Sequence, residues 1–540
     1  MGALTLKSFP FELRGWDIEK FESLDPTDGF GTSTRVYISK QQIIQIEPDH
    51  SEVTVNAWLS DKSRQFFDGI FGVTAQRNKN FLLKKESWQS GTKQLLKTLY
   101  LFEHCVAKIQ KRQFLTIIFE NLGLETLSLL KVLEQNFSFL RLRQAENLSL
   151  PNDLEYTFQL NNTTTPNKLK SSTLCLLVGT NPRYEGYPLN LKLRQRHLKG
   201  NFKCLVLGSL INLTFQNTVI GTNTKVFKSI SEGNNFACQD FKAAKKPLLI
   251  FGDEFYKRDD SQMLLNLFSD ISHTNLITPN WNGLNTMNST LAQTGTQSVK
   301  AFKPIQVKDF TESSSFYFLN TNSKDTPNLK KIAELKLLNC QLISTQTPQK
   351  ACLKILDQNS SNTNNQTFVQ NFFGSKMDKS YTFLPVKMFY ETEETFLSTN
   401  GNFKRTNKLI AGRKTKEGWK LLRNLQKQLK NQYVSLSYRN NCRISFNSLQ
   451  KASFINFMSF HYFAVEKIDS LQPSLTTCNQ PFFQNKKHSI FKKNLSKISN
   501  SKLKYWMDDF FIGGKDMYSK NSLVLSNCSK ILRVQSTNFF

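Results

Sequence analysis

The stretch LCLLVGTNP, residues 174–182, decides the fold of this 540-residue chain. Five apolar residues follow one another from Leu174 to Val178, which is typical of a strand buried on both faces of a parallel sheet. The residues Gly179-Thr180-Asn181-Pro182 then predict a turn. A helix is expected from Leu189 to His197. This strand–turn–helix order predicts a βαβ arrangement.

Three more stretches repeat the pattern of a short apolar strand with a turn behind it. They are Lys203–Leu207 before Gly208, Pro247–Phe251 before Gly252, and Ser315–Leu319 before polar residues. Together they predict an α/β fold with a parallel sheet of Rossmann-like type. None of the turns reads G-x-G-x-x-G or Walker A, so we interpret them as strand-to-helix geometry rather than as nucleotide sites.

The segment before these strands is expected to be rich in β-structure. Ser33–Tyr37 and Gln42–Ile46 predict two strands joined by a polar turn near Ser39-Lys40. From 88 to 119 the apolar spacing indicates alternating helix and strand. The polar segments 161–172 and 357–366 are interpreted as loops.

The composition limits the possible classes of protein. The formal net charge is +29, which favours anionic partners. The densest basic stretches, 404–430 and 486–504, lack the interleaved aromatic residues of an RNA module, so a solvated or subunit-facing basic surface is preferred over nucleic-acid binding. No apolar run reaches the roughly 18 residues of a membrane span. The best candidate, Phe454–Val465, is interpreted as a buried segment.

The cysteines carry no recognisable metal pattern. There are nine, and the two closest in sequence, Cys340 and Cys352, are twelve residues apart, so no C-x-x-C run exists. This pattern indicates reduced thiols. The full set is Cys105, Cys175, Cys204, Cys238, Cys340, Cys352, Cys442, Cys478 and Cys528.

Candidate catalytic groups are equally scarce, and we predict no catalytic, cofactor-binding or metal-binding residue. The acidic group Glu391, Glu393 and Glu394 is interpreted as an exposed loop whose charge is balanced by Lys387 and Lys404. The pairs Asp259-Asp260 and Asp508-Asp509 are interpreted in the same way. The six histidines are scattered, without an H-E-x-x-H motif.

Several stretches, read in order, resemble one family, the large iron–sulfur subunit of mitochondrial respiratory complex I. In the first half of the chain these are Gly2–Thr5, Glu22–Asp25, Gly31–Ser33, Trp58–Arg64 with Asp68-Gly69, and Leu177–Glu185. In the second half they are Ala244–Pro247, Trp281-Asn282, Lys303-Pro304, Leu384-Pro385, Trp419-Lys420 and Asp509–Phe511. Each match is short, but the occurrence of all of them in the same order along the chain is specific to this family.

The resemblance implies a molybdopterin-oxidoreductase-like fold without a molybdenum cofactor. It implies a structural, non-catalytic subunit of NADH:ubiquinone oxidoreductase, supporting electron transfer from NADH to ubiquinone with proton translocation. On this interpretation the chain has no cofactor, and the iron–sulfur clusters lie in a partner chain, the N-terminal half of the same subunit. Other subunits of the hydrophilic arm would be further partners, on the matrix side of the inner mitochondrial membrane.

The same resemblance suggests four regions. Residues 1–80 form a β-rich N-terminal domain adjoining the cluster-bearing chain, 81–245 and 246–430 form two α/β regions, and 431–540 form a divergent C-terminal region. We expect residues 2–20 to lie beside a cluster of the partner, with Phe9, Phe11 and Trp16 as apolar cover and Arg14 paired to an acceptor.

Two alternatives stay open from the sequence. One is an active molybdopterin-dependent oxidoreductase, for which Cys105 is the only mildly placed metal ligand. The other is a basic nucleic-acid-binding protein of an organelle. Molybdenum content separates the first from a scaffold, and the salt dependence of RNA binding separates the second.

Overall fold

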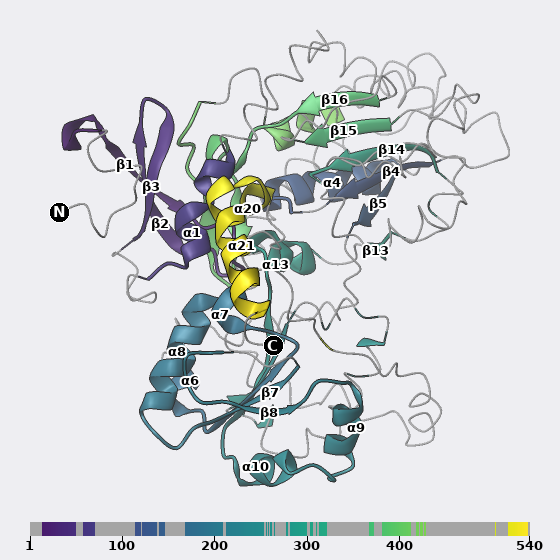
Figure 1. The fold of residues 1–540 in the computed structure, drawn as a ribbon. Coiled ribbons are helices and arrows are strands. Elements are labelled where there is room, and N and C mark those ends of the chain that lie inside the picture. The colour runs from purple at the N-terminus through teal and green to yellow at the C-terminus, as the bar shows by residue number, and fades with distance from the viewer. Residues whose placement is uncertain are drawn as a thin grey trace, which may run out of the picture.

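We analysed a computed structural model of the chain (Figure 1). It describes residues 13–49, 58–70, 114–119, 121–137, 140–145, 168–208, 212–252, 277–278, 281–299, 303–305, 313–320, 367–371, 381–411, 417–420, 422–424, 426–427 and 517–537, and the single positions 255, 258, 260, 261, 264, 309 and 503.

A five-stranded parallel sheet forms the lower lobe in Figure 1. Its strand order is β12-β9-β6-β7-β8. The strands are β6 (Leu174–Val178), β7 (Lys203–Leu207), β8 (Thr218–Gly221), β9 (Pro247–Gly252) and β12 (Leu284–Met287). The helices around it are α6 (Lys168–Ser171), α7 (Pro182–Glu185), α8 (Tyr187–Leu198), α9 (Lys225–Ser231) and α10 (Ala237–Ala243). The predicted strands at 174, 203 and 247 are thus confirmed, and the expected helix from 189 begins two residues earlier.

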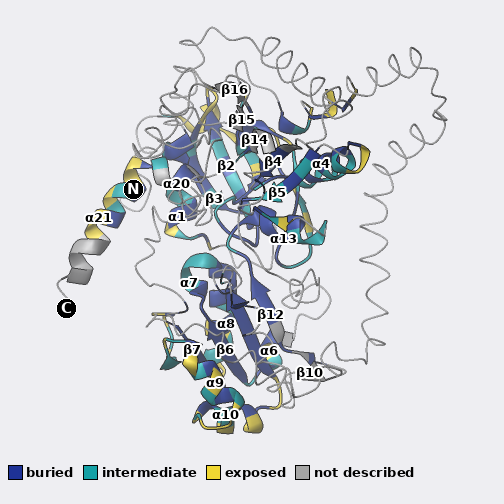
Figure 2. Cartoon of the chain, turned by 90° about the vertical axis from the view of Figure 1, so that its right-hand side faces the viewer, coloured by how far each residue is buried: buried dark blue, intermediate teal, exposed yellow. Residues whose placement is uncertain are grey.

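Both faces of β6 are buried, as its apolar run predicted (Figure 2). Leu174, Leu176 and Val178 pack in one core with residues of α9 and α10, including Phe227 and Phe241. Cys175 and Leu177 pack in a second core with Leu189 and Leu193 of α8. The period of two therefore divides one strand between two layers of helices.

A second sheet of six strands forms the upper right of Figure 1, in the order β13-β5-β4-β14-β15-β16. Its strands, all paired in parallel, are β4 (Phe114–Phe119), β5 (Leu140–Gln144), β13 (Lys303–Pro304), β14 (Ser313–Leu319), β15 (Thr367–Asn371) and β16 (Tyr381–Pro385). Helix α4 (Leu124–Asn136) packs on it through Leu127, Leu130 and Leu133. The fourth predicted strand, Ser315–Leu319, exists within β14 but lies in this sheet and not with the other three.

The expected regions remain proposals. The five-stranded sheet takes β6, β7 and β8 from before residue 245 and β9 and β12 from after it. One predicted loop is partly helical, because α6 occupies the end of the segment 161–172. The segments 357–366 and 454–465 lie outside the described residues.

The N-terminal domain is a three-stranded antiparallel sheet, β1 (Glu19–Leu24), β2 (Ser33–Ser39) and β3 (Gln42–Pro48), after the short helix η1 (Gly15–Asp17). The turn between β2 and β3 consists of Lys40 and Gln41, both with positive φ, as in the two-residue turns that suit a twisted hairpin. Helix α1 (Asp61–Gln65) follows and is capped by Ser60, whose Oγ accepts from the Ser63 N–H at 3.1 Å.

The remaining elements join these parts. They are β10 (Ile277–Thr278), β11 (Trp281–Asn282), α13 (Leu291–Ser298), η2 (Phe389–Glu391), β17 (Thr395–Leu397), β18 (Phe403–Arg405), α20 (Met517–Asn521) and α21 (Leu523–Thr537). Val36 of β2 shares a core with Tyr187 of α8, Tyr390 of η2 and Leu525 of α21. The N-terminal domain is therefore packed into the fold rather than appended to it. In the part of the chain that the structure describes, no helix is long and apolar enough to cross a membrane.

Candidate functional site: strand-end turns and two buried carboxylate groups

The carboxyl ends of β6, β7 and β9 meet at one edge of the lower sheet, where ligands of open α/β sheets bind. Gly179 follows β6 with φ +59°, and its N–H donates to the Leu207 carbonyl at 2.9 Å. A Cβ at Gly252 would lie only 2.7 Å from the Gly179 carbonyl oxygen. The neighbouring turns are thus packed against one another.

The polar side chains of the first turn are used within the turn. The Glu185 carboxylate accepts from the Thr180 hydroxyl at 2.6 Å and from the Asn181 N–H at 3.1 Å. Asn181 Oδ1 caps α7 by accepting from the Arg183 N–H. Leu503 covers Gly179, 3.7 Å from where its Cβ would be. The polar groups of this turn are therefore engaged with one another rather than turned toward a ligand.

A buried pair of carboxyl groups lies in the loop between β1 and β2. Asp25 Oδ1 accepts from the Thr27 N–H at 2.8 Å and from its hydroxyl at 2.7 Å, and Asp28 Oδ2 accepts from the Thr32 hydroxyl at 2.7 Å. Burial raises the pKa of Asp25, and it raises the pKa of Asp28 to about 7, to which the Asp25 charge also contributes. Asp28 can therefore exchange a proton near neutral pH.

Two buried tyrosines from other parts of the fold border this pair. The hydroxyl oxygen of Tyr390 has no hydrogen-bond partner within the described residues. Burial raises the pKa of both tyrosines. The charges of Asp28 and Asp25 raise the pKa of Tyr187 further, and the charge of Asp25 raises that of Tyr390. The pair thus lies where the N-terminal sheet meets α8 and η2. The sequence analysis singled out Asp25 only as part of a family-like stretch, since nothing local indicates that a loop carboxylate is buried.

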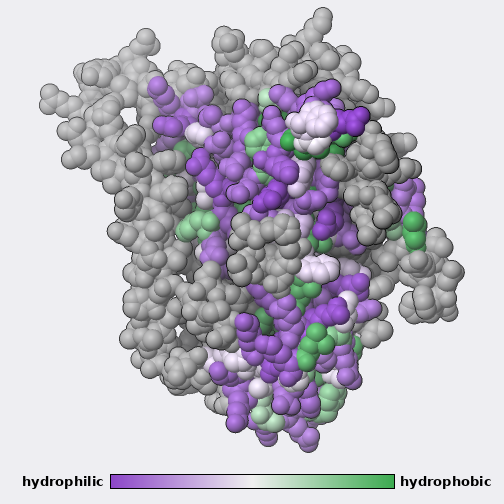
Figure 3. Space-filling model, turned by 90° about the vertical axis from the view of Figure 1, so that its left-hand side faces the viewer, coloured by the Kyte–Doolittle hydropathy of each residue, from purple (hydrophilic) through white to green (hydrophobic). Residues whose placement is uncertain are grey.

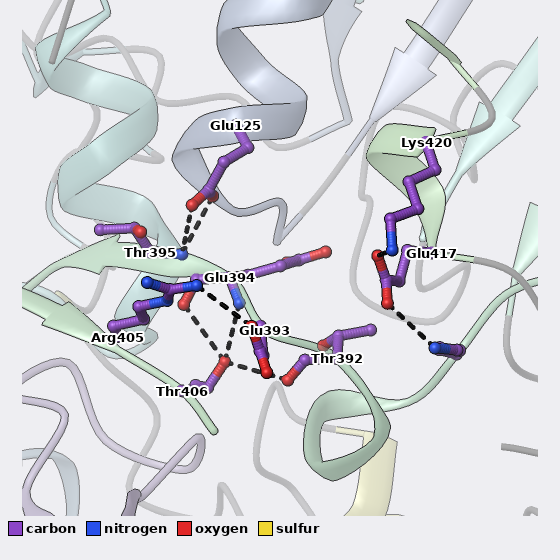
Figure 4. A network of polar contacts seen from close by, with 10 residues as sticks. Glu125, Thr392, Glu393, Glu394, Thr395, Arg405, Thr406, Glu417 and Lys420 are labelled. Atoms are coloured by element: carbon purple, nitrogen blue, oxygen red, sulfur yellow. Dashed lines mark hydrogen bonds and ion pairs between the residues drawn. The ribbon is translucent and has the colours of Figure 1, made fainter. Parts of the chain in front are cut away.

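A second group of carboxylates joins α4 to the hairpin β17–β18 (Figure 4). Glu125 of α4 accepts from the Thr395 N–H with both oxygens, at 2.9 and 3.0 Å. Burial, followed by the Glu125 charge, raises the pKa of Glu394 to about 8, although a hydrogen bond from the Gly123 backbone opposes this. The Glu125 carboxylate therefore binds the backbone at the start of β17, and the Glu394 carboxylate binds the backbone of Gly123, directly before α4.

Glu417 behaves differently, because cations surround it. Its oxygens lie 3.0 Å from Lys387 Nζ and 2.5 Å from Lys420 Nζ. Burial acts to raise the pKa of Glu417, but the hydrogen bonds and charges of these two lysines outweigh it and lower that pKa. Lys387 therefore forms an ion pair with Glu417, whereas it was expected to balance the charge of Glu391, Glu393 and Glu394.

The interpretation of Glu391, Glu393 and Glu394 as an exposed loop is right only for Glu393, which is exposed and pairs with Arg405 at 3.1 Å. Glu391 is buried, and its Oε2 caps η2 by accepting a hydrogen bond from the Met388 N–H at 2.9 Å. Asp260 is also buried and pairs with Arg258 at 2.8 Å. Asp259, Asp508, Asp509 and Cys105 lie outside the described residues.

Two family models match the chain. Residues 111–428 match the molybdopterin oxidoreductase family, and residues 18–68 match the 4Fe-4S domain of NADH-ubiquinone oxidoreductase NDSU1/NuoG-like proteins. The first match covers more than half of the 540 residues. The chain therefore belongs to the molybdopterin oxidoreductase family.

The relatives it resembles are larger proteins. The NADH-ubiquinone oxidoreductase 75 kDa subunit of Reclinomonas americana is 28% identical over 314 residues, 55% of this chain and 44% of the relative. The mitochondrial NADH dehydrogenase (ubiquinone) iron-sulfur protein 1 of Solanum tuberosum is 26% identical, over 54% of this chain and 39% of the relative. For an NADH-quinone oxidoreductase subunit of Rickettsia conorii the identity is 26%, over 61% of this chain and 48% of the relative. The chain thus spans less than half the length of each.

The prediction that this chain has no cofactor is wrong. The match of residues 18–68 to a 4Fe-4S domain points to an iron–sulfur cluster in the chain itself. Residues 18–68, however, contain no cysteine, and no group of three or more His, Cys, Asp or Glu side chains that could hold a metal ion occurs among the described residues. These residues do not fit a cluster by themselves.

The described cysteines are placed as core or helix residues. Cys175 and Cys204 are neighbours in the register of β6 and β7 and are buried. Contact with Cys204 and burial raise the pKa of the Cys175 thiol, which opposes formation of a thiolate ligand. Cys238 and Cys528 lie on α10 and α21.

Proposed function

We propose that this chain is part of the large iron–sulfur subunit of respiratory complex I and contributes no catalytic residue of its own. It would hold neighbouring parts of the arm in place while electrons pass from NADH toward ubiquinone, a transfer that the whole complex couples to proton translocation. The turn after β6 supports this role, because its polar groups are used internally and Gly179 is covered by Leu503.

One observation carries the proposal. The segment 18–68, which matches the iron–sulfur domain, shares its core with the molybdopterin-like part of the chain. Phe66, after α1, stacks on Tyr390 with ring centroids 6.2 Å apart, and Tyr187 joins the same core. A rigid connection between these parts is what a scaffold for electron transfer needs.

Two exposed tryptophans support a docking site for a further part of the subunit. Trp16, just before β1, is 82% exposed, and Trp58, just before α1, is 62% exposed. Large exposed aromatic residues are common anchors of protein interfaces. We propose that they contact the remaining iron–sulfur part of the subunit, supplied as a separate polypeptide. Phe9 and Phe11, expected in the same contact, lie outside the described residues.

The location follows from the same proposal. As part of the hydrophilic arm, the chain would lie on the matrix side of the inner mitochondrial membrane and contact other arm subunits. One of the relatives is named as a mitochondrial protein. Fractionation of mitochondria, with protease protection and carbonate extraction, would test this placement.

An assembly experiment tests the docking role. Trp16→Ala and Trp58→Ala together should reduce the amount of complex I that contains this chain, seen by native electrophoresis with NADH-dehydrogenase staining. The matched control is Phe236→Ala, which removes an aromatic side chain that is 58% exposed in the lower lobe. Normal assembly of the double variant would contradict the docking role.

The family match also favours a second candidate, a molybdopterin-dependent oxidoreductase. The turn after β6 speaks against it, because Gly179 packs against Gly252 and Leu503. Stoichiometric molybdenum or tungsten in the purified chain, measured by mass spectrometry of the elements, would favour the enzyme over the scaffold.

A further inference from the structure

The amino ends of the lower sheet form a surface that the proposed function does not use. Because the sheet is parallel, β6, β7 and β9 begin at one edge, and the helices that precede them, α6, α8 and α10, end there. In Figures 1 and 2 this is the foot of the lower lobe, where α10 lies. Its exposed cations, which we call the basic edge, are Lys170, Lys199, Lys203, Lys242, Lys245 and Lys246.

The charge of the segment from α6 to β9 is strongly one-sided. Residues 168–252 contain thirteen lysines and arginines against three acidic residues. All three acids are engaged: Glu185 within its turn, Glu232 with Lys228 at 3.6 Å, and Asp240 with Lys203 at 2.5 Å. The acids of this segment therefore leave most of the positive charge uncompensated.

Helix ends explain only part of this arrangement. Cations in the last turn of a helix interact favourably with its dipole, which accounts for Lys242 at the end of α10. Lys203, however, is the first residue of β7, and Lys246 directly precedes β9, so neither position is stabilised by a helix dipole. The concentration of charge at this edge thus exceeds what the helices need.

The edge is also held rigidly. The Arg196 guanidinium donates to the Ser172 carbonyl at 2.8 Å and to the Gly200 carbonyl at 2.7 Å. The Lys246 N–H donates to Thr173 Oγ1, and the Lys203 N–H to the Thr173 carbonyl. Beside these cations Leu198, the last residue of α8, is 73% exposed. The backbone that carries these lysines is therefore already ordered before a partner binds.

We propose that the basic edge is a docking surface for an acidic protein surface, with Leu198 as its apolar anchor. A protein interface has an apolar core and a polar rim, and Leu198 among these cations offers a small version of both. The exposed aromatic residue Phe236 comes just before α10, at the end of that helix away from the edge, which disfavours stacking of single-stranded RNA on the edge. One leucine inserts little apolar area into a lipid surface. The side of the lower lobe that faces the viewer in Figure 3 is mainly hydrophilic, with scattered hydrophobic residues.

Charge reversal at matched positions tests the location. The probe is fluorescent polyglutamate, titrated with the full chain at low and at physiological salt. Lys242→Glu with Lys245→Glu should weaken binding about tenfold and lessen its salt dependence. The control, Lys225→Glu with Lys228→Glu, makes the same charge change on α9, which begins at the opposite edge of the sheet. It should change affinity by less than about twofold.

Further outcomes decide the rest. Equal weakening by both pairs would overturn the proposal, as would tighter binding of single-stranded RNA or of anionic vesicles than of polyglutamate. Leu198→Ser should weaken binding of an acidic peptide that contains leucines and spare polyglutamate. Unchanged binding of the leucine peptide removes the anchor from the proposal. If the reversed pair unfolds the lobe, Lys242→Gln with Lys245→Gln repeats the test without placing an acid at the end of α10.

Discussion

Gly179 and Gly252 show two different reasons for a glycine at the end of a strand. Gly179 has φ +59°, but a Cβ there would make only ordinary contact with Leu503 at 3.7 Å. Gly252 has no such φ, but its Cβ would meet the Gly179 carbonyl oxygen at 2.7 Å. The crowding at Gly252 could not be predicted from the sequence, because contact between two strand ends is invisible in either stretch alone.

The two glycines should therefore respond differently to alanine. Gly179→Ala should cost about 1–2 kcal/mol of unfolding free energy through backbone strain. Gly252→Ala should cost roughly 1–3 kcal/mol or more, because backbone atoms must move. Guanidinium unfolding measures both, with Gly15→Ala as the control, since nothing lies within 4 Å of its Cβ. Equal stability of the Gly252→Ala protein and the wild type would contradict the packing of the turns.

Glu394 should make the stability of the chain depend on pH. Its pKa is about 8 in the folded protein, above its ordinary 4.5, so the folded state binds this proton more tightly than the unfolded state. The contribution is complete below pH 4.5 and is lost as the pH rises through about 8. Glu394→Gln should flatten this part of the curve, while Glu393→Gln, at an exposed position, should not. An unchanged curve for Glu394→Gln would place the titration elsewhere, for example at Asp28.

Among the elements, those set by local pattern could be predicted. The run Leu174–Val178, the strand Lys203–Leu207 and the hairpin on either side of Lys40 follow from periodicity and turn residues, and the structure has them. What could not be predicted is which elements pair. Ser315–Leu319 looked like a fourth strand of the same series, yet β14 pairs with β4 and β15 in the other sheet. Pairing of that kind depends on contacts between residues far apart in the chain.

The joint between α4 and β17 makes a prediction about two elements together. Glu125→Gln removes the negative charge that helps to raise the pKa of Glu394, while its amide oxygen can still accept from the Thr395 N–H. The decline of stability with rising pH should therefore move to lower pH. Chemical unfolding over a pH series measures the shift. A Glu125→Gln curve that coincides with that of the wild type would show that the two carboxyl groups do not interact.

For the whole molecule, the decisive feature is that the N-terminal domain is packed into the fold. Neither this packing nor the burial of Asp25 and Asp28 could be predicted from the sequence. Both involve contacts with Tyr187 and Tyr390, which are far from the N-terminal domain in the chain. The absence of a cysteine motif suggested a chain without a cofactor, and the match of residues 18–68 to a 4Fe-4S domain overturned that prediction. The family resemblance itself was confirmed.

Phe66 is the residue on which this packing most depends. It is fully buried and contacts the rings of Tyr390 and Tyr518, with centroids 6.2 and 6.1 Å away. Phe66→Ala should cost about 3–5 kcal/mol, and limited proteolysis should then cut the N-terminal domain before the lower lobe. Phe403→Ala, at an exposed position, is the control. Equal protease resistance of the two variants would mean that the domain is not held by this core.

Affinity purification of the tagged chain from native membranes in mild detergent tests the central claim most directly. The purified material should catalyse electron transfer from NADH to ubiquinone and contain the other subunits of the hydrophilic arm in fixed ratio. Recovery of the chain free of that activity, or in a molybdenum-containing enzyme, would contradict its assignment to complex I.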